Sequence, residues 1–197
     1  MFSMSDVLIA RNDLANIIDI KNEKLNRINN HNLRVSELSV KFATALNLSL
    51  DDINQILIGS YLHDIGKIFL GNEILEGDHP LSKRQRGEML NHTVLGHGYL
   101  NDVCGLDKAK DIILLHHEKV DGTGYPHGLA GSEIPIHVKM VSICDSYDAM
   151  TSYRAYRPKQ LTHQEAIQEL LDNKGTQFDS MLVDVFVTHL EISYSNS

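Results

Sequence analysis

Tryptophan is absent from this sequence, and only two cysteines, Cys104 and Cys144, occur among its 197 residues. Two such distant cysteines have neither the spacing of a thiolate metal site nor the density of a disulfide framework. The N-terminus lacks the charged and then apolar pattern of a secretory signal. No apolar run approaches the ~20 residues that a membrane span requires. We therefore expect a cytoplasmic protein that makes no membrane contact of its own.

Positive charge is also scarce, because 18 lysines and arginines stand against 26 aspartates and glutamates, a net charge of -8. Such a chain has no basic field to attract nucleic acid, which we exclude as a partner. With 42% hydrophobic residues, a chain of this length can bury a substantial core. We predict a single domain over residues 30–191, preceded by a helical arm at 1–29 and followed by a frayed tail at 192–197.

Apolar residues recur at helical spacing along most of the chain, and the alternation typical of strands is rare, so we predict an all-α fold. The arm is amphipathic over residues 5–28 and is expected to pack against the domain or to form a homodimer. Ser49, Ser82 and Thr162 each match a helix-capping pattern. The helices of the domain are expected from His31 to Leu46, from Ser49 to Asp64, from Ser82 to Leu100, over 109–118, from Pro135 to Met150, and in two segments after Thr162 separated by a turn at Gly175. A loop is expected over 71–80.

The 11 histidines are the most informative feature, because several fall at predicted helix ends or on apolar faces. His63 and Asp64 adjoin each other in an apolar run, where both are costly to bury unless something binds them. Taken singly, the others have ordinary explanations: His31 suits a helix cap or the surface, and Asp145 suits a hydrogen-bond acceptor. The candidate metal ligands are five imidazoles and two carboxylates: His31, His63, Asp64, His92, His116, His117 and Asp145.

This ligand set exceeds the four ligands of a structural zinc site and suits two divalent ions that share a carboxylate, for which Asp64 is the best candidate. Imidazole mixed with carboxylate favours Fe or Mn, with Zn, Ni, Co or Mg as alternatives. Lys67 projects from the same side as His63 and Asp64, where it can hold a phosphate or simply complete a helical turn. Arg154 and Arg157 are spaced to converge on one phosphate or base, or to remain solvated. The residues alone indicate a metallohydrolase.

The order of these motifs resembles the HD-GYP family, the cyclic di-GMP phosphodiesterase branch of the HD metal-dependent phosphohydrolases. The resemblance runs from about His31 to Phe186. The segments that carry it are His63-Asp64-Ile65-Gly66-Lys67, His92, His116-His117-Glu118-Lys119-Val120-Asp121-Gly122-Thr123-Gly124-Tyr125-Pro126, Asp145-Ser146-Tyr147-Asp148-Ala149-Met150, Arg154 to Arg157 and Gly175-Thr176-Gln177-Phe178-Asp179.

The resemblance implies an HD-type helical bundle with additional C-terminal helices. It implies one ion held by His31, His63, Asp64 and Asp145, and a second held by Asp64, His92, His116 and His117. Asp64 and Lys67 would be catalytic, with Lys67 on the scissile phosphate. The substrate-binding residues would be Lys67, Arg154, Arg157, Gly124, Tyr125 and Pro126. The last three would also offer a surface to a GGDEF-type or other signalling protein.

The implied activity is hydrolysis of the 3′-5′ phosphodiester bonds of cyclic di-GMP to linear pGpG, to GMP, or to both, in bacterial second-messenger signalling. Some family members hold a third metal through a glutamate at the position of Arg27, so the resemblance implies two metals here. The loop Leu70-Gly71-Asn72 and Ala155 also depart from the family pattern, near the substrate. Two alternatives therefore stay open: an HD phosphohydrolase for another cyclic dinucleotide or nucleotide, and a module that binds cyclic di-GMP or a protein without turnover.

Overall fold

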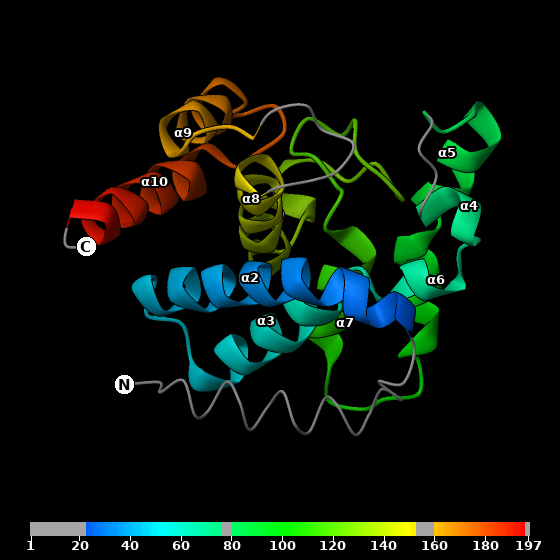
Figure 1. Cartoon of the computed structure of the whole chain (residues 1–197). Coiled ribbons are helices and arrows are strands. Elements are labelled where there is room, and N and C mark those ends of the chain that lie inside the picture. Colours follow the sequence, from blue (N-terminus) through cyan, green and yellow to red (C-terminus); the bar gives the residue numbers. More distant parts are fainter. Residues whose placement is uncertain (1–22, 76–79, 153–159, 196–197) are drawn as a thin grey trace.

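The computed structural model describes residues 23–75, 80–152 and 160–195, which Figure 1 shows as an assembly of helices. The only β-type pairings in this part of the chain are two isolated bridges, Asp121 with Ala130 and Lys174 with Phe178. The all-α prediction is therefore confirmed. The elements are α2 (Glu23–Ala45), α3 (Leu50–Leu62), the 3-10 helix η1 (Ile65–Phe69), α4 (Asn72–Leu75), α5 (Lys83–Leu90), α6 (His92–Tyr99), α7 (Asp107–Leu115), the 3-10 helix η2 (Gly131–Glu133), α8 (Ile136–Thr151), α9 (His163–Asp172) and α10 (Ser180–Ser195).

Three helices begin at the capping residues that the sequence indicates. The Ser49 hydroxyl accepts a hydrogen bond from the Asp52 backbone N–H at the start of α3. Ser82 and Thr162 each form a reciprocal capping box at the starts of α5 and α9. Such caps satisfy backbone N–H groups that have no partner within the helix.

Other boundaries differ from the prediction. The helix expected to begin near His31 already begins at Glu23, so this boundary is wrong and the predicted division at residue 29 falls inside α2. Residues 1–22 of the predicted arm lie outside the described residues. The helix expected over 82–100 is two helices, because the Asn91 N–H bonds to the Glu88 carbonyl, one residue short of the α-helical partner.

Two further segments are more helical than expected. The short helix α4 occupies residues 72–75 of the expected loop, and its Ile74 side chain is buried. Helix α10 continues to Ser195, so residues 192–195 of the tail expected to fray are helical. Buried Leu190 anchors this helix against the core just before them.

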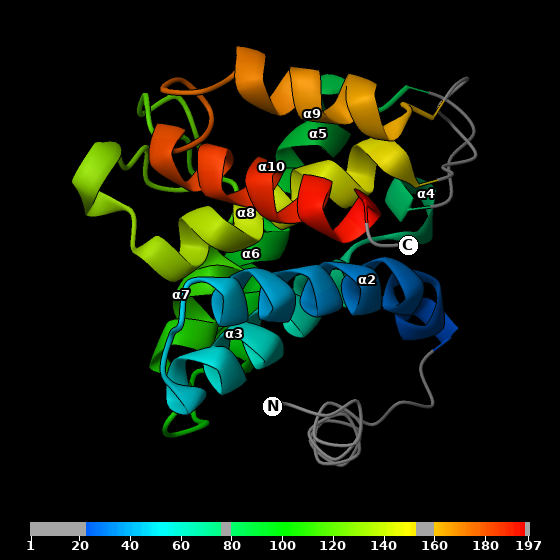
Figure 2. The ribbon, with the colours of Figure 1, turned by 90° about the vertical axis from the view of Figure 1, so that its left-hand side faces the viewer.

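The main hydrophobic core lies between α2, α3, α7, α8 and the C-terminal pair α9 and α10. Figure 2 shows α9 and α10 on one side of α8, with α2 and α3 on the other side. The rings of Phe42 from α2 and Phe186 from α10 lie 5.1 Å apart, which joins the two ends of the described chain. Within the described ranges, no helix is long and apolar enough to cross a membrane.

A smaller cluster of Leu62, Ile65, Leu100 and Ile113 holds the end of α3 and η1 against α6 and α7. The backbones approach most closely at Gly66, where an added Cβ would stand 1.9 Å from the His92 carbonyl oxygen. Only glycine fits such a contact. This close crossing brings the junction of α3 and η1 next to the first turn of α6.

Candidate metal centre

Five helices deliver the seven candidate ligands to one place. His31 lies in α2, His63 and Asp64 lie at the junction of α3 and η1, and Asp145 lies in α8. The remaining three are His92, which is the first residue of α6, and His116 and His117, which directly follow α7.

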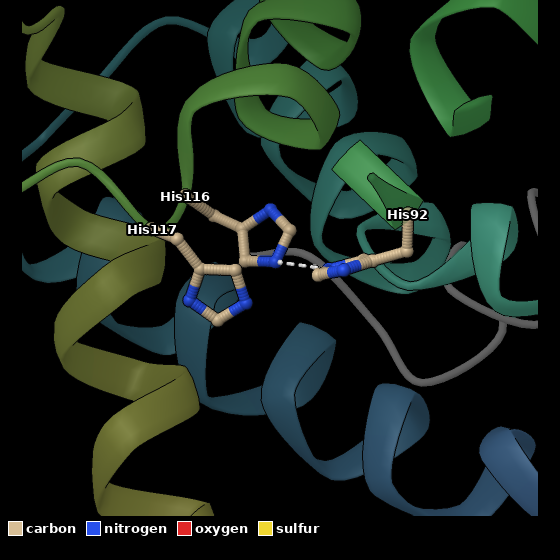
Figure 3. Close-up of side chains that lie close together, drawn as sticks. All are labelled: His92, His116 and His117. Carbon is tan, nitrogen blue, oxygen red and sulfur yellow. Dashed lines mark hydrogen bonds between the residues drawn. The ribbon is translucent and has the colours of Figure 1, made fainter. Parts of the chain in front are cut away.

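The imidazoles of His92, His116 and His117 form one group, whose possible ligand atoms all lie within 4.8 Å of one another. In Figure 3 the three rings converge between α6 and the end of α7. His92 Nε2 and His116 Nε2 lie 3.4 Å apart. Two imidazole nitrogens facing each other in this way offer a cation at least two lone pairs at a single point.

A second group consists of His31, His63 and Asp64, again with ligand atoms within 4.8 Å of one another. Asp145 extends this group, because its Oδ1 lies 2.9 Å from His31 Nε2 and 3.8 Å from His63 Nε2. The structure therefore places Asp145 with His31 and His63.

Asp64 stands between the two groups. Its Oδ2 lies 3.4 Å from His63 Nε2 in one group, and its Oδ1 lies 3.4 Å from His92 Nε2 in the other. Lys67 Nζ lies 2.5 Å from the same Oδ2, as their shared side of the turn after α3 indicates. A buried carboxylate with one oxygen toward each imidazole group has the geometry that a bridging ligand needs.

Three of the imidazoles are oriented by backbone carbonyls three or four residues earlier in the chain. Nδ1 of His63 donates to the Ser60 carbonyl at 2.6 Å, and Nδ1 of His92 donates to the Met89 carbonyl at 2.7 Å. His116 Nδ1 similarly faces the Ile112 carbonyl at 3.1 Å. Because a carbonyl only accepts, each Nδ1 carries the proton and each Nε2 presents a lone pair to the site.

The residues present fit a metal centre on an observation of this structure. His63 Nε2 is fully buried and has no hydrogen-bond partner among the described residues, a costly arrangement unless a cation binds it. The donor set is imidazole and carboxylate, which suits intermediate divalent metals. The fold therefore builds a cluster whose donor atoms fit divalent cations.

Electrostatics keep His116, His117 and Asp64 in the protonation states that metals require. Burial lowers the pKa of His116 well below its usual value and that of His117 to about 4, so both are neutral near pH 7. Burial raises the pKa of Asp64, but the charge of Lys67 outweighs it and holds that pKa well below the usual range. Asp64 is therefore ionised.

The segment Gly124-Tyr125-Pro126 lies against the group of His92, His116 and His117. The Tyr125 ring stacks on His117 with centroids 4.8 Å apart and an interplanar angle of 26°. Gly124 packs on the backbone of residues 117–119, where an added Cβ would stand 2.4 Å from the Lys119 nitrogen. Burial, with Asp64 and Asp145 nearby, raises the pKa of Tyr125, so its hydroxyl stays protonated. Arg154 and Arg157, expected to bind substrate, lie outside the described residues.

Sequence reasoning assigned no role to two buried carboxylates beside the site. Glu118 accepts hydrogen bonds from the backbone N–H groups of His127, Gly128 and Leu129, and so ties down the loop that carries Tyr125. Asp148 accepts a hydrogen bond from His31 and two from Arg34. Both carboxylates occur inside the recognised motifs, but their partners come from residues that no sequence spacing relates to them.

Comparison with known proteins identifies the family to which this helical fold belongs. A model of the HD domain matches residues 14–182. The chain belongs to the HD domain family. Its likeness to solved HD structures agrees: the fold matches an HDG"Y"P protein from Bdellovibrio bacteriovorus with a TM-score of 0.67 at 21% identity, covering 83% of this chain and 52% of that one. It also matches the HD domain of a Listeria monocytogenes phosphodiesterase solved with cyclic-di-AMP, with a TM-score of 0.61 at 17% identity, covering 87% and 95%.

Several proteins that are related to this HD domain in sequence are named phosphodiesterases. A "Cyclic di-GMP phosphodiesterase" of Thermotoga maritima is 36% identical over 80% of this chain and 43% of its own length. A "Probable cyclic di-GMP phosphodiesterase" of Vibrio cholerae is 34% identical over 80% of this chain and 39% of its own length. The chain thus spans about two fifths of the length of these curated relatives.

Proposed function

We propose that this HD domain hydrolyses the 3′-5′ phosphodiester bonds of cyclic di-GMP, to linear pGpG or onward to GMP. The observation that carries the proposal is the position of Asp64, with one carboxylate oxygen toward each of two imidazole groups. The names of the sequence relatives support the same substrate class. A centre of this kind is able to act on a phosphoryl group, because paired cations can neutralise charge on both the attacking and the leaving oxygen.

The proposed centre holds two divalent ions, with Fe or Mn preferred and Zn, Ni, Co or Mg as alternatives. One would be held by His31, His63, Asp64 and Asp145, and the other by Asp64, His92, His116 and His117. When bound, such ions supply Lewis-acid charge to phosphoryl oxygens and lower the pKa of water toward neutrality. The donor types and the 4.8 Å grouping of the ligand atoms support this division.

Lys67 is the proposed catalytic cation of the protein itself. Its side chain is 24% exposed while Asp64 is buried, so the ammonium lies at the rim of the cluster, where a phosphate oxygen can reach it. A fixed positive charge at that point stabilises the charge that develops on a non-bridging oxygen during hydrolysis. Tyr125 closes the neighbouring side by covering His117, with its hydroxyl protonated and able to donate.

We also propose that the Gly124-Tyr125-Pro126 segment contacts a GGDEF-type or other signalling protein. Residues 1–29 would support a homodimer, and the protein would act in the cytoplasm. Arg154 and Arg157 would bind the dinucleotide.

The test is a hydrolysis assay on anaerobically purified protein loaded with Fe or Mn. We expect Lys67→Met to keep two bound ions but to lower kcat by ~10²–10³, the effect of removing one group that stabilises developing charge. Lys108→Met is the matched control, since Lys108 is ion-paired with Asp52 on α3 and away from the cluster. Full activity of Lys67→Met would overturn the assignment of Lys67.

The substrate is tested in the same assay with a panel of nucleotides. The panel includes 3′3′-cGAMP, because a Vibrio cholerae relative that is 31% identical over 90% of this chain and 34% of its own length is named a "3'3'-cGAMP-specific phosphodiesterase 2". Faster hydrolysis of 3′3′-cGAMP or cyclic-di-AMP would move the proposal to that substrate. Binding of cyclic di-GMP by the loaded protein without cleavage would replace the enzyme by a binding module.

A further inference from the structure

Asp148 is a buried carboxylate on α8, one helical turn beyond Asp145. Its side chain is 4% exposed, and it has three partners. His31 Nδ1 donates to its Oδ2 at 2.6 Å, and the Arg34 guanidinium donates through Nε at 2.6 Å and Nη2 at 3.0 Å. The Ser152 hydroxyl donates at 3.0 Å. This network is fully satisfied and joins α2 to α8.

His31 is the exception among the oriented imidazoles of the site. His63, His92 and His116 hold their Nδ1 protons against backbone carbonyls three or four residues earlier in the chain. His31, in the middle of α2, instead uses a carboxylate that is 117 residues away in sequence. The direction of its Nε2, toward Asp145 at 2.9 Å, therefore depends on Asp148 and on the packing of α8.

Charge explains why Arg34 belongs to the same unit. Asp148 adds a third carboxylate beside Asp64 and Asp145, and such a cluster is unfavourable unless cations balance it. Arg34 offers the bidentate geometry that holds a carboxylate in one orientation. Its side chain is 45% exposed, so it is a surface residue whose head group is anchored inward.

We propose that Asp148 and Arg34 form a positioning pair that sets the metal affinity of one half of the centre, the half built from His31, His63, Asp64 and Asp145. The proposal rests on the proposed two-ion centre. The carboxylate makes the imidazole of His31 a stronger donor and fixes its ring, and loss of such partners typically costs 10–100-fold in metal affinity. Among the described residues, neither Asp148 nor Arg34 forms a hydrogen bond or ion pair with His92, His116 or His117. We therefore expect the other half, built from these three residues and Asp64, to keep its affinity.

The test titrates the metal-free full chain with Mn²⁺, with free Mn²⁺ followed by electron paramagnetic resonance, and extracts two dissociation constants. We expect Asp148→Asn to weaken one constant at least about tenfold and to leave the other unchanged. Arg34→Gln should shift the same constant by a smaller factor, and Arg34→Lys should partly restore it. The matched control is Asp179→Asn, which breaks the Lys139 ion pair of α8 outside the site while keeping a capping residue at α10.

The ratio of the two constants separates a positioning role from a structural one. A wild-type chain that binds no Mn²⁺ overturns both the two-ion centre and this pair. Two bound ions with an unchanged ratio in Asp148→Asn and Arg34→Gln overturn the pair alone, as do equal losses at both sites or the same shift in Asp179→Asn. If Asp148→Asn does not fold, Arg34→Gln decides, because Arg34 lies at the surface.

Discussion

Replacing Gly66 by alanine tests whether the crossing of η1 and α6 sets the geometry of the centre. An added Cβ would stand 1.9 Å from the His92 carbonyl oxygen, 2.6 Å from the Gly96 nitrogen and 2.8 Å from the His92 carbonyl carbon. All three atoms belong to the backbone, so no rotamer change relieves the contact. Ordinary contact begins at 3.4 Å, so the two backbones must separate by about 1.5 Å.

The expected cost is at the upper end of that for overpacked cores, about 3 kcal/mol. For a chain of this size, such a loss of unfolding free energy lowers Tm by about 6–12 °C. The same movement carries His92 away from Asp64, whose Oδ1 now lies 3.4 Å from His92 Nε2. Metal distances tolerate only about 0.2 Å, and a 1 Å misplacement can cost about 10²-fold in rate.

The assay combines thermal unfolding of the metal-free protein with Mn²⁺ titration. Gly98→Ala is the matched control, since Gly98 lies in the same helix α6 and an added Cβ meets nothing within 4 Å. Alanine at an unhindered helical position should stabilise the fold by about 0.5–1 kcal/mol. The reasoning is refuted if Gly66→Ala is as stable as Gly98→Ala and binds Mn²⁺ as tightly.

Two further predictions concern the loop and the ions. Glu118→Gln replaces a carboxylate that accepts hydrogen bonds from three backbone N–H groups by a side chain with one acceptor oxygen. It should therefore lower the free energy of unfolding by about 1–3 kcal/mol, measured by thermal unfolding. The control is Glu133→Gln, at an exposed residue whose side chain accepts one described hydrogen bond, from the Ala130 N–H, and equal stability of the two variants would contradict the role of Glu118. Adding Mn²⁺ at about 100 times its dissociation constant should stabilise the metal-free chain by about 2.7 kcal/mol per site, and a chelator should reverse the effect. A Tm unchanged by Mn²⁺ would argue against any ion in the cluster.

The candidate ligands could be found from sequence because their chemistry is conspicuous there. His63 and Asp64 interrupt an apolar run, and His116 and His117 end one, so burial followed from periodicity alone. The pairing of Lys67 with Asp64 followed from a spacing of three residues, which one turn of helix fixes. Local geometry therefore carried these inferences.

What sequence reasoning missed depends on contacts between distant segments. The contacts of Asp148 could not be inferred from the sequence, where it stands only as part of a motif, because its partners His31 and Arg34 lie more than 110 residues earlier. The break at Asn91 depends on one shortened backbone hydrogen bond, which no residue type in that stretch signals. Nothing in the sequence indicates that a side chain cannot fit at Gly66, since the atoms that exclude one belong to α6.

The two halves of the centre rest on different parts of the core. His92 and His116 are placed by the small cluster of Leu62, Ile65, Leu100 and Ile113, whereas His31 and Asp145 are placed by the packing of α2 on α8 in the main core. Asp64 follows directly from α3, the helix that packs against both. A carboxylate can bridge two cations only when the ligands of both halves are held at bonding distance from them. Cations bound there would therefore stabilise the contact between the two cores as well as the site itself. The burial of Asp64 beneath Lys67 is thus a feature of the fold as much as of the chemistry.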